Sequence, residues 1–400
     1  MHCVQKISED IYWVGGNDRR LERFENMFPI PNGVCYNSYL ILDEKTALMD
    51  TVDNAISRLF IENITHVLNG RDLDYLVVNH MEPDHCANIE ELVRRHPNIK
   101  IVGNKKTFPF IGQFYDFDYS MNMLEIKDCD TLCLGKHNLK FITAPMVHWP
   151  EVMFTYEETE KILFSADAFG TFGALAGNLF SDETDYEHFY LDEARRYYAN
   201  IVGKYGQQVQ SALKKVSNYE IKTICSLHGP VWRENLQFLI DKYIKWSNYE
   251  PEKSGVVLVY ASMYGNMENT MNVIANKLAQ KGIKDMRMYD VSKTHPSYII
   301  SDIWKYSHVI VGSVTYNMGL YYGMESLLNE LKALNMQNRK VGIVGSGTWS
   351  CQAAKLMQEI ICSMKNMEVV GIPFEITSSM KQNQEETVDK FVEEFCSSIN

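Results

Sequence analysis

A regular alternation of short apolar runs and amphipathic stretches constrains the fold more than any other feature, and it continues from Val256 to the C-terminus. The runs have the length and composition of strands, and the stretches between them show helical spacing of apolar residues. Five runs lie at 256–262, 286–292, 308–314, 340–347 and 367–377, and five helical stretches lie at 266–282, 296–307, 324–335, 351–364 and 385–399. Strands that are joined by helices pair in parallel, so this region predicts a doubly wound α/β domain with a five-stranded parallel sheet.

The preceding residues show a less regular mixture of patterns. Strand-like runs occur in a hairpin at 35–51 and at 74–80, 99–104, 137–145, 161–169 and 221–229, and helical stretches occur at 55–68 and between about 186 and 217. The segment 247–255 places Pro251 and Gly255 among charged residues, which is typical of a linker. The sequence therefore predicts two domains, at 1–251 and 252–400.

The densest group of metal-ligand side chains is the motif HMEPDH, which begins at the end of the apolar run 74–80. It supplies His80, Glu82, Asp84 and His85 within six residues. A loop that leaves the carboxyl end of a strand can direct such side chains toward one point. The alternative is a polar loop with chance histidines, and the recurrence of ligand types after later strands argues against it.

Three later candidates are His148 in APMVHWP, Asp167 in LFSADAFG and His228 in SLHGP, and each follows an apolar run. Taken singly, a histidine after a strand is more often structural than a ligand. Taken together with HMEPDH, the three residues predict a metal site that several loops assemble on a rigid sheet.

The second domain carries a candidate ligand site in three loops. SMYGNMENT (262–270) offers hydroxyls, backbone N–H groups and a helix N-terminus, which can hold a phosphate without lysine. Alone, this loop is equally consistent with a polar turn. GSVTYNMGLY (312–321) and GSGTWSCQAA (345–354) follow later parallel strands, where open α/β sheets bind ligands. Tyr316 and Trp349 in these loops are suited to cover an isoalloxazine ring.

The motif HMEPDH, followed by His148, Asp167 and His228, resembles the metallo-β-lactamase pattern HxHxDH…H…D…H, with Glu82 in place of the second histidine. An added carboxylate favours a harder, redox-capable metal such as iron over Zn²⁺. With a flavodoxin-like region behind it, the pattern resembles the flavodiiron proteins over essentially the whole chain. This resemblance implies an N-terminal metallo-β-lactamase-like αββα sandwich and a C-terminal flavodoxin-like doubly wound five-stranded parallel sheet.

The resemblance also implies two cofactors, a non-haem di-iron centre and FMN. One iron would take His80, Glu82 and His148, the other Asp84, His85 and His228, and Asp167 would bridge them, although the histidine at the His85 position does not ligate in every member. The implied FMN contacts are Ser262, Met263, Tyr264, Gly265, Asn266, Met267, Ser313, Val314, Thr315, Tyr316, Asn317, Gly319, Ser346, Gly347, Thr348, Trp349 and Ser350. Many relatives have Pro where Val314 stands and Gly-Trp where Thr348–Trp349 stands, and we still expect FMN to bind.

The expected function is the four-electron reduction of O₂ to water, because a flavin passes on electrons singly and a di-iron site offers two together. Reduction of two NO to N₂O on the same site is the alternative. A zinc hydrolase with an attached flavodoxin module and a non-enzymatic electron carrier are two further hypotheses. Glu82 and the complete ligand set argue against them.

Two aromatic positions are candidates for a supporting catalytic role. Trp149 stands beside His148, and Tyr198 (or its neighbour Tyr197) could donate a hydrogen bond to a bound intermediate. The alternative is that these aromatic residues belong to the core.

The expected partners also follow from the resemblance. Family members form head-to-tail dimers that bring the FMN of one subunit to the iron site of the other, so a homodimer or dimer of dimers is expected. Electrons are expected from a separate donor, which could be a rubredoxin-type protein, a flavin reductase or a reduced soluble cofactor.

Charge and composition narrow the partners and the location further. The net charge of −12 argues against binding of nucleic acid or anionic membrane. The N-terminus lacks the pattern of a signal peptide, and no run approaches the roughly 18 apolar residues of a membrane span, so a cytoplasmic protein is expected.

Overall fold

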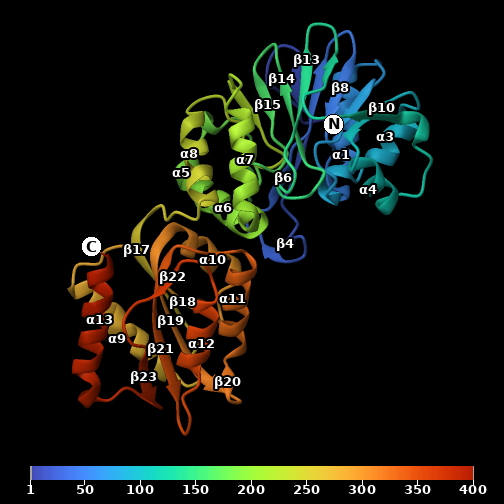
Figure 1. Ribbon diagram of the computed structural model, residues 1–400. Coiled ribbons are helices and arrows are strands. Elements are labelled where there is room, and N and C mark those ends of the chain that lie inside the picture. The colour runs from blue at the N-terminus through green and yellow to red at the C-terminus, as the bar shows by residue number, and fades with distance from the viewer. Residues whose placement is uncertain (1, 400) are drawn as a thin grey trace. The chain divides into compact units, whose positions relative to one another are not determined.

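The computed structural model describes residues 2–399, which form two compact units (Figure 1). The first unit contains residues 2–198 and 207–243, and the second contains residues 199–206 and 244–399. No sequence pattern had indicated that the short segment 199–206 belongs to the second unit. The predicted domain division between residues 251 and 252 stays a prediction.

Within residues 2–243, two sheets lie between two sets of helices (Figure 1). One sheet has the strand order β1-β2-β7-β8-β9-β10-β11 and the other has the order β12-β13-β14-β15-β16. The strands are β1 (Gln5–Lys6), β2 (Ile11–Trp13), β3 (Gly16–Asp18), β4 (Arg23–Phe24), β5 (Phe28–Pro29), β6 (Val34–Tyr36), β7 (Tyr39–Leu42), β8 (Thr46–Met49), β9 (Tyr75–Val77), β10 (Lys100–Asn104), β11 (Met123–Ile126), β12 (Thr131–Cys133), β13 (Asn138–Thr143), β14 (Met153–Glu157), β15 (Ile162–Phe164) and β16 (Thr223–Cys225). The helices are α1 (Ser57–Leu68), α2 (Pro83–Cys86), α3 (Ile89–Arg95), α4 (Thr107–Phe114), α5 (Tyr186–Phe189), α6 (Leu191–Tyr197), α7 (Gly206–Val216) and α8 (Leu236–Ser247). The αββα architecture predicted for this part of the chain is therefore confirmed.

The helices predicted between about 186 and 217 are α5, α6 and α7, and a π-helix at Tyr198–Val202 and a 3₁₀ turn at Gly203–Tyr205 separate α6 from α7. One local prediction in this unit needs correction. The strand expected at 161–169 already ends at Phe164, because Ala166 and Phe169 adopt left-handed backbone conformations (φ 49° and 71°) that a strand excludes.

Within residues 244–399, the parallel sheet has the order β18-β17-β19-β21-β22 (Figure 1). Its elements are β17 (Lys253–Tyr260), α9 (Asn266–Gln280), β18 (Met286–Asp290), α10 (Pro296–Lys305), β19 (Tyr306–Tyr316), β20 (Gly319–Leu320), α11 (Tyr322–Ala333), β21 (Arg339–Gly347), α12 (Ala353–Cys362), β22 (Met367–Val369), β23 (Phe374–Thr377) and α13 (Glu385–Ile399). The single strand expected at 367–377 is split, because Gly371 is left-handed (φ 68°) and Pro373 cannot donate to a ladder. Both halves pair with β21, so the predicted doubly wound sheet is confirmed.

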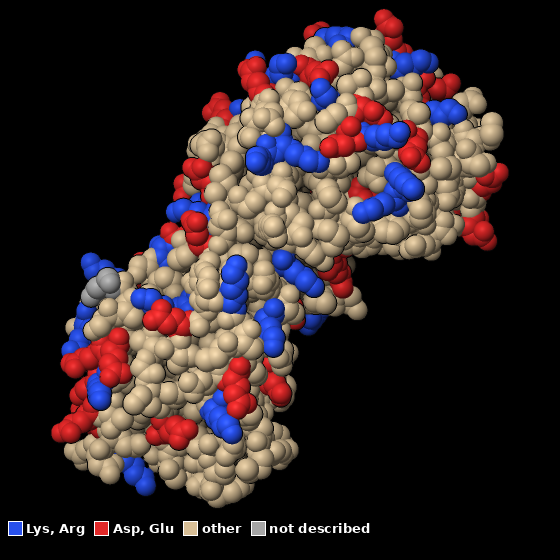
Figure 2. All heavy atoms as spheres, viewed as in Figure 1, with Lys and Arg blue, Asp and Glu red and all other residues tan. Residues whose placement is uncertain are grey.

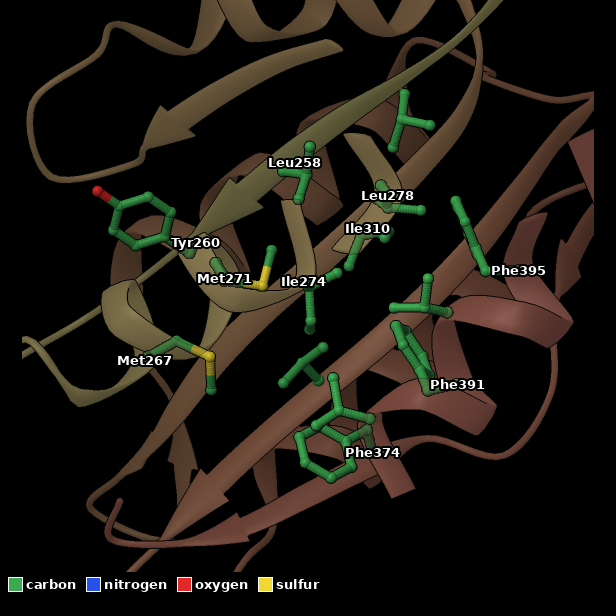
Figure 3. Close-up of a cluster of buried hydrophobic side chains, with 14 of the residues drawn as sticks. Leu258, Tyr260, Met267, Met271, Ile274, Leu278, Ile310, Phe374, Phe391 and Phe395 are labelled. Carbon is green, nitrogen blue, oxygen red and sulfur yellow. The ribbon is translucent and has the colours of Figure 1, made fainter. Parts of the chain in front are cut away.

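The core of the second unit lies between this sheet and helices α9 and α13 (Figure 3). Leu258 and Ile310 from the sheet meet Met271 of α9 and Phe391 of α13 in one buried cluster. The apolar helix faces that the spacing predicted are therefore the faces that pack on the sheet. This packing holds the sheet, and the loops at its carboxyl end, in place.

On the visible face of each unit, acidic and basic side chains are interspersed (Figure 2). Within residues 2–399, every helix is too short or too polar to cross a membrane.

Arg339 is a buried cation at the start of β21 that holds several backbone segments of the second unit together. Its guanidinium group donates hydrogen bonds to carbonyl oxygens of Ile303 (2.7 Å), Trp304 (2.8 Å) and Tyr249 (2.7 Å). Complete burial lowers the pKa of Arg339 to about 9. The side chain therefore caps the last turn of α10 and holds the segment before β17 against it.

We expect Arg339→Met to lower the free energy of unfolding of the second unit by about 3–5 kcal/mol, because buried carbonyl groups lose a charged donor. Denaturation of the full chain, followed by tryptophan fluorescence, measures the change. Arg287→Met is the control, since Arg287 is exposed and its nitrogen lies 3.8 Å from Asp302, an ion pair worth about 1 kcal/mol or less. Equal effects of the two substitutions would contradict the role assigned to Arg339.

Candidate metal centre and ligand cavity

The HMEPDH loop is fixed at its start by the buried carboxylate of Asp50, directly after β8. Asp50 Oδ1 accepts hydrogen bonds from the backbone N–H groups of Asn79 (2.7 Å) and His80 (3.1 Å). The loop then enters α2, which begins with Pro83, and Thr51 donates from its backbone N–H (2.8 Å) and hydroxyl (2.9 Å) to the carbonyl of His85. These bonds turn the side chains of Glu82, Asp84 and His85 inward.

The remaining candidate ligands come from loops that follow strands of the second sheet. His148 follows β13, Asp167 follows β15 and His228 follows β16. Asn37 fixes the last of these loops, because its amide donates to the carbonyls of Ser226 (2.9 Å) and Gly229 (2.8 Å). The structure thus brings together all seven residues named from the sequence, and each is at most 8% exposed.

One group, called position 1 here, consists of His80, Glu82, His148 and Asp167. The Nε2 atoms of His80 and His148 each lie 3.1 Å from Glu82 Oε2. Asp167 Oδ2 lies 3.4 Å from His80 Nε2 and 3.2 Å from His148 Nε2. Two imidazoles and two carboxylates therefore point at one centre, as a metal ion requires.

A second group, called position 2 here, consists of Asp84, His85 and His228. The Nε2 atoms of the two histidines are 3.1 Å apart, and Asp84 Oδ2 lies 3.2 Å from His85 Nε2. Asp167 Oδ1 lies 3.1 Å from His85 Nε2 and 3.7 Å from His228 Nε2. The two oxygens of Asp167 thus face different positions, which is the arrangement of a bridging carboxylate.

The donor atoms fit metal ions better than they fit one another. Both oxygens of Asp84 and Oδ1 of Asp167 are buried and form no hydrogen bond within residues 2–399. Buried carboxylates without hydrogen bonds are costly unless a cation compensates them. Two metal ions, one in each position, would supply that compensation.

The protonation pattern of the protein without metal follows from the same contacts. Burial alone would lower the pKa of His148, but hydrogen bonds to Asp167 and Glu82 raise it to about 9. Burial would raise the pKa of Asp167, but the charges of His85 and His80 hold it well below its ordinary value. Without metal, protons on the imidazoles therefore take the place of the missing positive charge.

Trp149 and Tyr197 contact the metal-binding residues from outside. The ring of Trp149 packs edge-on against His80, with centroids 5.4 Å apart, and the ring of Tyr197 lies 5.4 Å from His228. The hydroxyl of Tyr197 is buried and has no hydrogen-bond partner within residues 2–399. The ring of Tyr198, the catalytic candidate predicted from the sequence, packs on Tyr243 instead, at 5.1 Å. The geometry thus favours Tyr197 over Tyr198 as the tyrosine of the centre.

Glu25, at the turn between β4 and β5, was not predicted from the sequence. The residue is exposed overall, yet its carboxyl group reaches Glu82 in position 1. Desolvation of this carboxyl group and the charge of Glu82 raise the pKa of Glu25 to about 9. Nothing in the sequence indicated this contact, because Glu25 lies far along the chain from every other candidate ligand. The adjacent Phe24, whose ring lies 5.3 Å from His228, also connects the hairpin to the centre.

A cavity of about 460 Å³ lies at the loops that follow β17, β19 and β21 in the second unit. The predicted contacts that line it are Ser262, Met263, Tyr264, Asn266, Met267, Val314, Thr315, Tyr316, Asn317, Ser346, Gly347, Thr348, Trp349 and Ser350. Met318 and Ser378 line it as well and were not predicted. Trp349 is 90% exposed and Tyr264 is 85% exposed, so two large rings stand free to cover a flat ligand.

The other predicted contacts shape this cavity from behind. Gly265 is left-handed (φ 84°) and donates from its N–H to the hydroxyl of Ser262 (3.1 Å), which turns the chain into the N-terminus of α9. Ser313 is buried, and Gly319 pairs with Tyr316 in the β19–β20 hairpin. A helix N-terminus with adjacent hydroxyls suits a phosphate, and the exposed rings suit a planar ring system.

Comparisons with known proteins agree with this architecture. Residues 34–229 match the family described as ODP family beta lactamase, and residues 258–390 match the flavodoxin family. The nitric oxide reductase of Moorella thermoacetica is 32% identical over 374 residues, which cover 92% of this chain and 91% of that protein. The chain belongs to the flavodiiron proteins.

Solved structures of flavodiiron proteins support the same assignment. Rubredoxin oxygen:oxidoreductase from Desulfovibrio gigas superposes with a TM-score of 0.93 at 28% identity, covering 99% of this chain and 98% of that chain. The flavodiiron protein from Giardia intestinalis superposes with a TM-score of 0.88 at 25% identity, covering 100% and 99%. The predicted family, fold class and oxidoreductase class are confirmed.

We expect metal uptake by the metal-free protein to strengthen as pH rises. His148 is protonated below a pKa of about 9, so a metal must displace this proton, and affinity rises about tenfold per pH unit for each proton displaced. Titration with Co²⁺ between pH 6 and pH 8.5, followed by absorption, measures the slope. An affinity that is independent of pH would contradict the protonation pattern.

Proposed function

We propose that this flavodiiron protein reduces O₂ to water at two irons held in positions 1 and 2, with electrons from FMN in the cavity of the second unit. The observation that carries the proposal is Asp167, whose two oxygens face two separate groups of ligands. Three carboxylates among the seven candidate ligands favour iron over zinc. Two irons held in this way would supply electrons to a diatomic molecule from both sides.

The protein's own residues would shape the pocket and hold protons beside it. The rings of Phe24 and Tyr36 lie 5.3 Å and 5.7 Å from His228 and exclude water from that side. Burial and the charge of Asp167 raise the pKa of Tyr197 well above its ordinary value, so its hydroxyl keeps its proton and can donate a hydrogen bond. Reduction of O₂ to water consumes four electrons and four protons, and Tyr197 and Glu25 are the groups best placed to orient or deliver protons.

A second candidate function is the reduction of two NO to N₂O. The printed name of the Moorella thermoacetica relative, nitric oxide reductase, favours it. Both reactions would use the same ligands, so the metal positions alone do not separate them. Membership of the flavodiiron family weighs against the zinc hydrolase and the electron carrier.

The remaining partners are also proposals. Because the metal positions and the flavin cavity belong to separate compact units, we retain the head-to-tail homodimer or dimer of dimers. The name of the Desulfovibrio gigas structure points to a rubredoxin-type donor, with a flavin reductase or reduced soluble cofactor as alternatives. We place the protein in the cytoplasm. A monomer with full activity would contradict the dimer.

We expect the anaerobically reduced, iron- and FMN-loaded protein to be reoxidised rapidly by O₂, with water and not peroxide as the product. Stopped-flow absorption of the flavin, after separate mixing with O₂ and with NO, measures both rates. Asp167→Asn should abolish the fast phase, because the shared carboxylate would lose one charged oxygen. Faster reoxidation by NO with N₂O formation would make the second candidate the main function, and slow reaction with both gases would refute both.

We expect Trp349→Ala to weaken FMN binding by about 1–3 kcal/mol, because aromatic stacking on a flat heterocycle contributes about that much. Quenching of FMN fluorescence on titration of the flavin-free protein measures the loss. Tyr322→Ala is the matched control, since Tyr322 is an exposed aromatic residue outside the cavity lining. An unchanged affinity in Trp349→Ala would remove this residue from the proposed flavin contacts.

A further inference from the structure

Glu151, three residues after His148, lies directly behind position 1. It is buried, and its Oε1 accepts hydrogen bonds from His80 Nδ1 (2.9 Å) and from the backbone N–H of Met81 (2.9 Å). Because His80 directs its Nε2 at position 1, the contact with Glu151 fixes the ring orientation and keeps the proton on Nδ1.

Position 2 lacks such a carboxylate. His228 donates from Nδ1 to the backbone carbonyl of Cys35 (2.8 Å), which is polar but carries no net charge. His85 Nδ1 is buried and forms no hydrogen bond within residues 2–399. The two positions therefore present similar ligand atoms to their metals, but they differ in the hydrogen-bond acceptor at the Nδ1 atoms of their imidazoles.

The carboxylate of Glu151 interacts with a single charged partner. Within residues 2–399, its only ion pair is with His80, and its second oxygen Oε2 is buried and forms no hydrogen bond. A carboxylate behind a ligating imidazole makes that imidazole a stronger donor, and loss of such a partner costs about 10–100-fold in metal affinity. Through His80, Glu151 therefore adds negative charge to position 1 alone.

We propose that Glu151 is a positioning residue that makes the two metal positions unequal. Position 1 binds the first metal ion more tightly, and in the iron-loaded protein it is the position that favours the ferric state. The second statement rests on the proposed function, because it requires iron in both positions. The first statement applies to any divalent metal that imidazole and carboxylate ligands accept.

The test is Glu151→Gln, which keeps the acceptor for His80 and Met81 but removes the charge. Glu157→Gln is the matched control, because Glu157 is also buried and accepts from His137 Nδ1 (3.0 Å) and from the backbone N–H of Thr159 (2.8 Å). His137 belongs to neither position 1 nor position 2, so the control removes a buried pair away from the centre. Because His137 forms a third, partly exposed group of potential ligands with Asp10 and Glu160, any Co²⁺ bound there is counted separately from the two steps compared.

The probe is Co²⁺, added to metal-free protein in competition with a chelator. We expect the wild type and Glu157→Gln to bind two ions with unequal affinities, and Glu151→Gln to weaken only the tighter step, by about 10–100-fold. Proton NMR of the Co²⁺ form should show that Glu151→Gln moves the exchangeable N–H resonance of His80 and leaves that of His228 in place. Equal weakening of both steps, or no change in either, would overturn the proposal.

Two further measurements keep the test decisive. If Glu151→Gln does not fold, Glu151→Asp retains the charge and should keep the two steps unequal, and equal steps in that variant would overturn the proposal. In the iron form, the separation between the two reduction potentials should narrow in Glu151→Gln. Co²⁺ binding needs neither iron nor turnover, so unequal binding in a protein that reduces neither gas would refute the proposed function and leave this inference intact.

Discussion

The first unit depends on the compensation of one buried charge, the carboxylate of Asp167. Its two oxygens lie near three imidazoles from two different loops, at 3.1–3.2 Å from His85 and His148 and at 3.4 Å from His80. A carboxylate buried without opposite charge costs several kcal/mol, so these loops are stable together and not singly. The same requirement explains why both sheets contribute: β9 supplies the start of HMEPDH, whereas β13, β15 and β16 supply His148, Asp167 and His228.

The sequence predicted those residues of the centre that are marked by their immediate neighbours in the chain. HMEPDH places its ligands within six residues, and the other three each follow an apolar run. Glu151 stands three residues after His148 and yet carries no mark that separates it from a surface acid. Its role appears only when β9 and the β13–β14 connection are brought together. Tyr197 and Tyr198 differ by one position at the end of α6, where the π-helix begins, and no periodicity decides which ring faces the metals.

More of the second unit than of the first could be predicted from the sequence, because a regular alternation of strands and helices is compatible with few topologies. Its errors have local causes: Gly371 and Pro373 interrupt the last strand, and the left-handed residues Met318 (φ 63°) and Ser378 (φ 63°) bring two unexpected side chains to the cavity. Positive φ values at residues other than glycine are set by tertiary contacts and leave little trace in composition. The five-stranded parallel sheet was therefore more predictable than the cavity wall.

The choice between O₂ and NO has to lie outside the seven candidate ligands, because both reactions would use the same ones. Three features remain: the hydroxyl of Tyr197, the carboxyl group of Glu25, and the charge that Glu151 adds behind His80. Each acts on a different quantity, namely the hydrogen bond offered to a bound gas, the supply of protons, and the balance of charge between the two positions. Reduction of O₂ requires four protons and four electrons, whereas coupling of two NO requires two of each, so a centre that supplies protons readily is the one expected to favour O₂. The carboxyl group of Glu25, which reaches Glu82 in position 1, is therefore the structural reason for keeping O₂ as the main proposal.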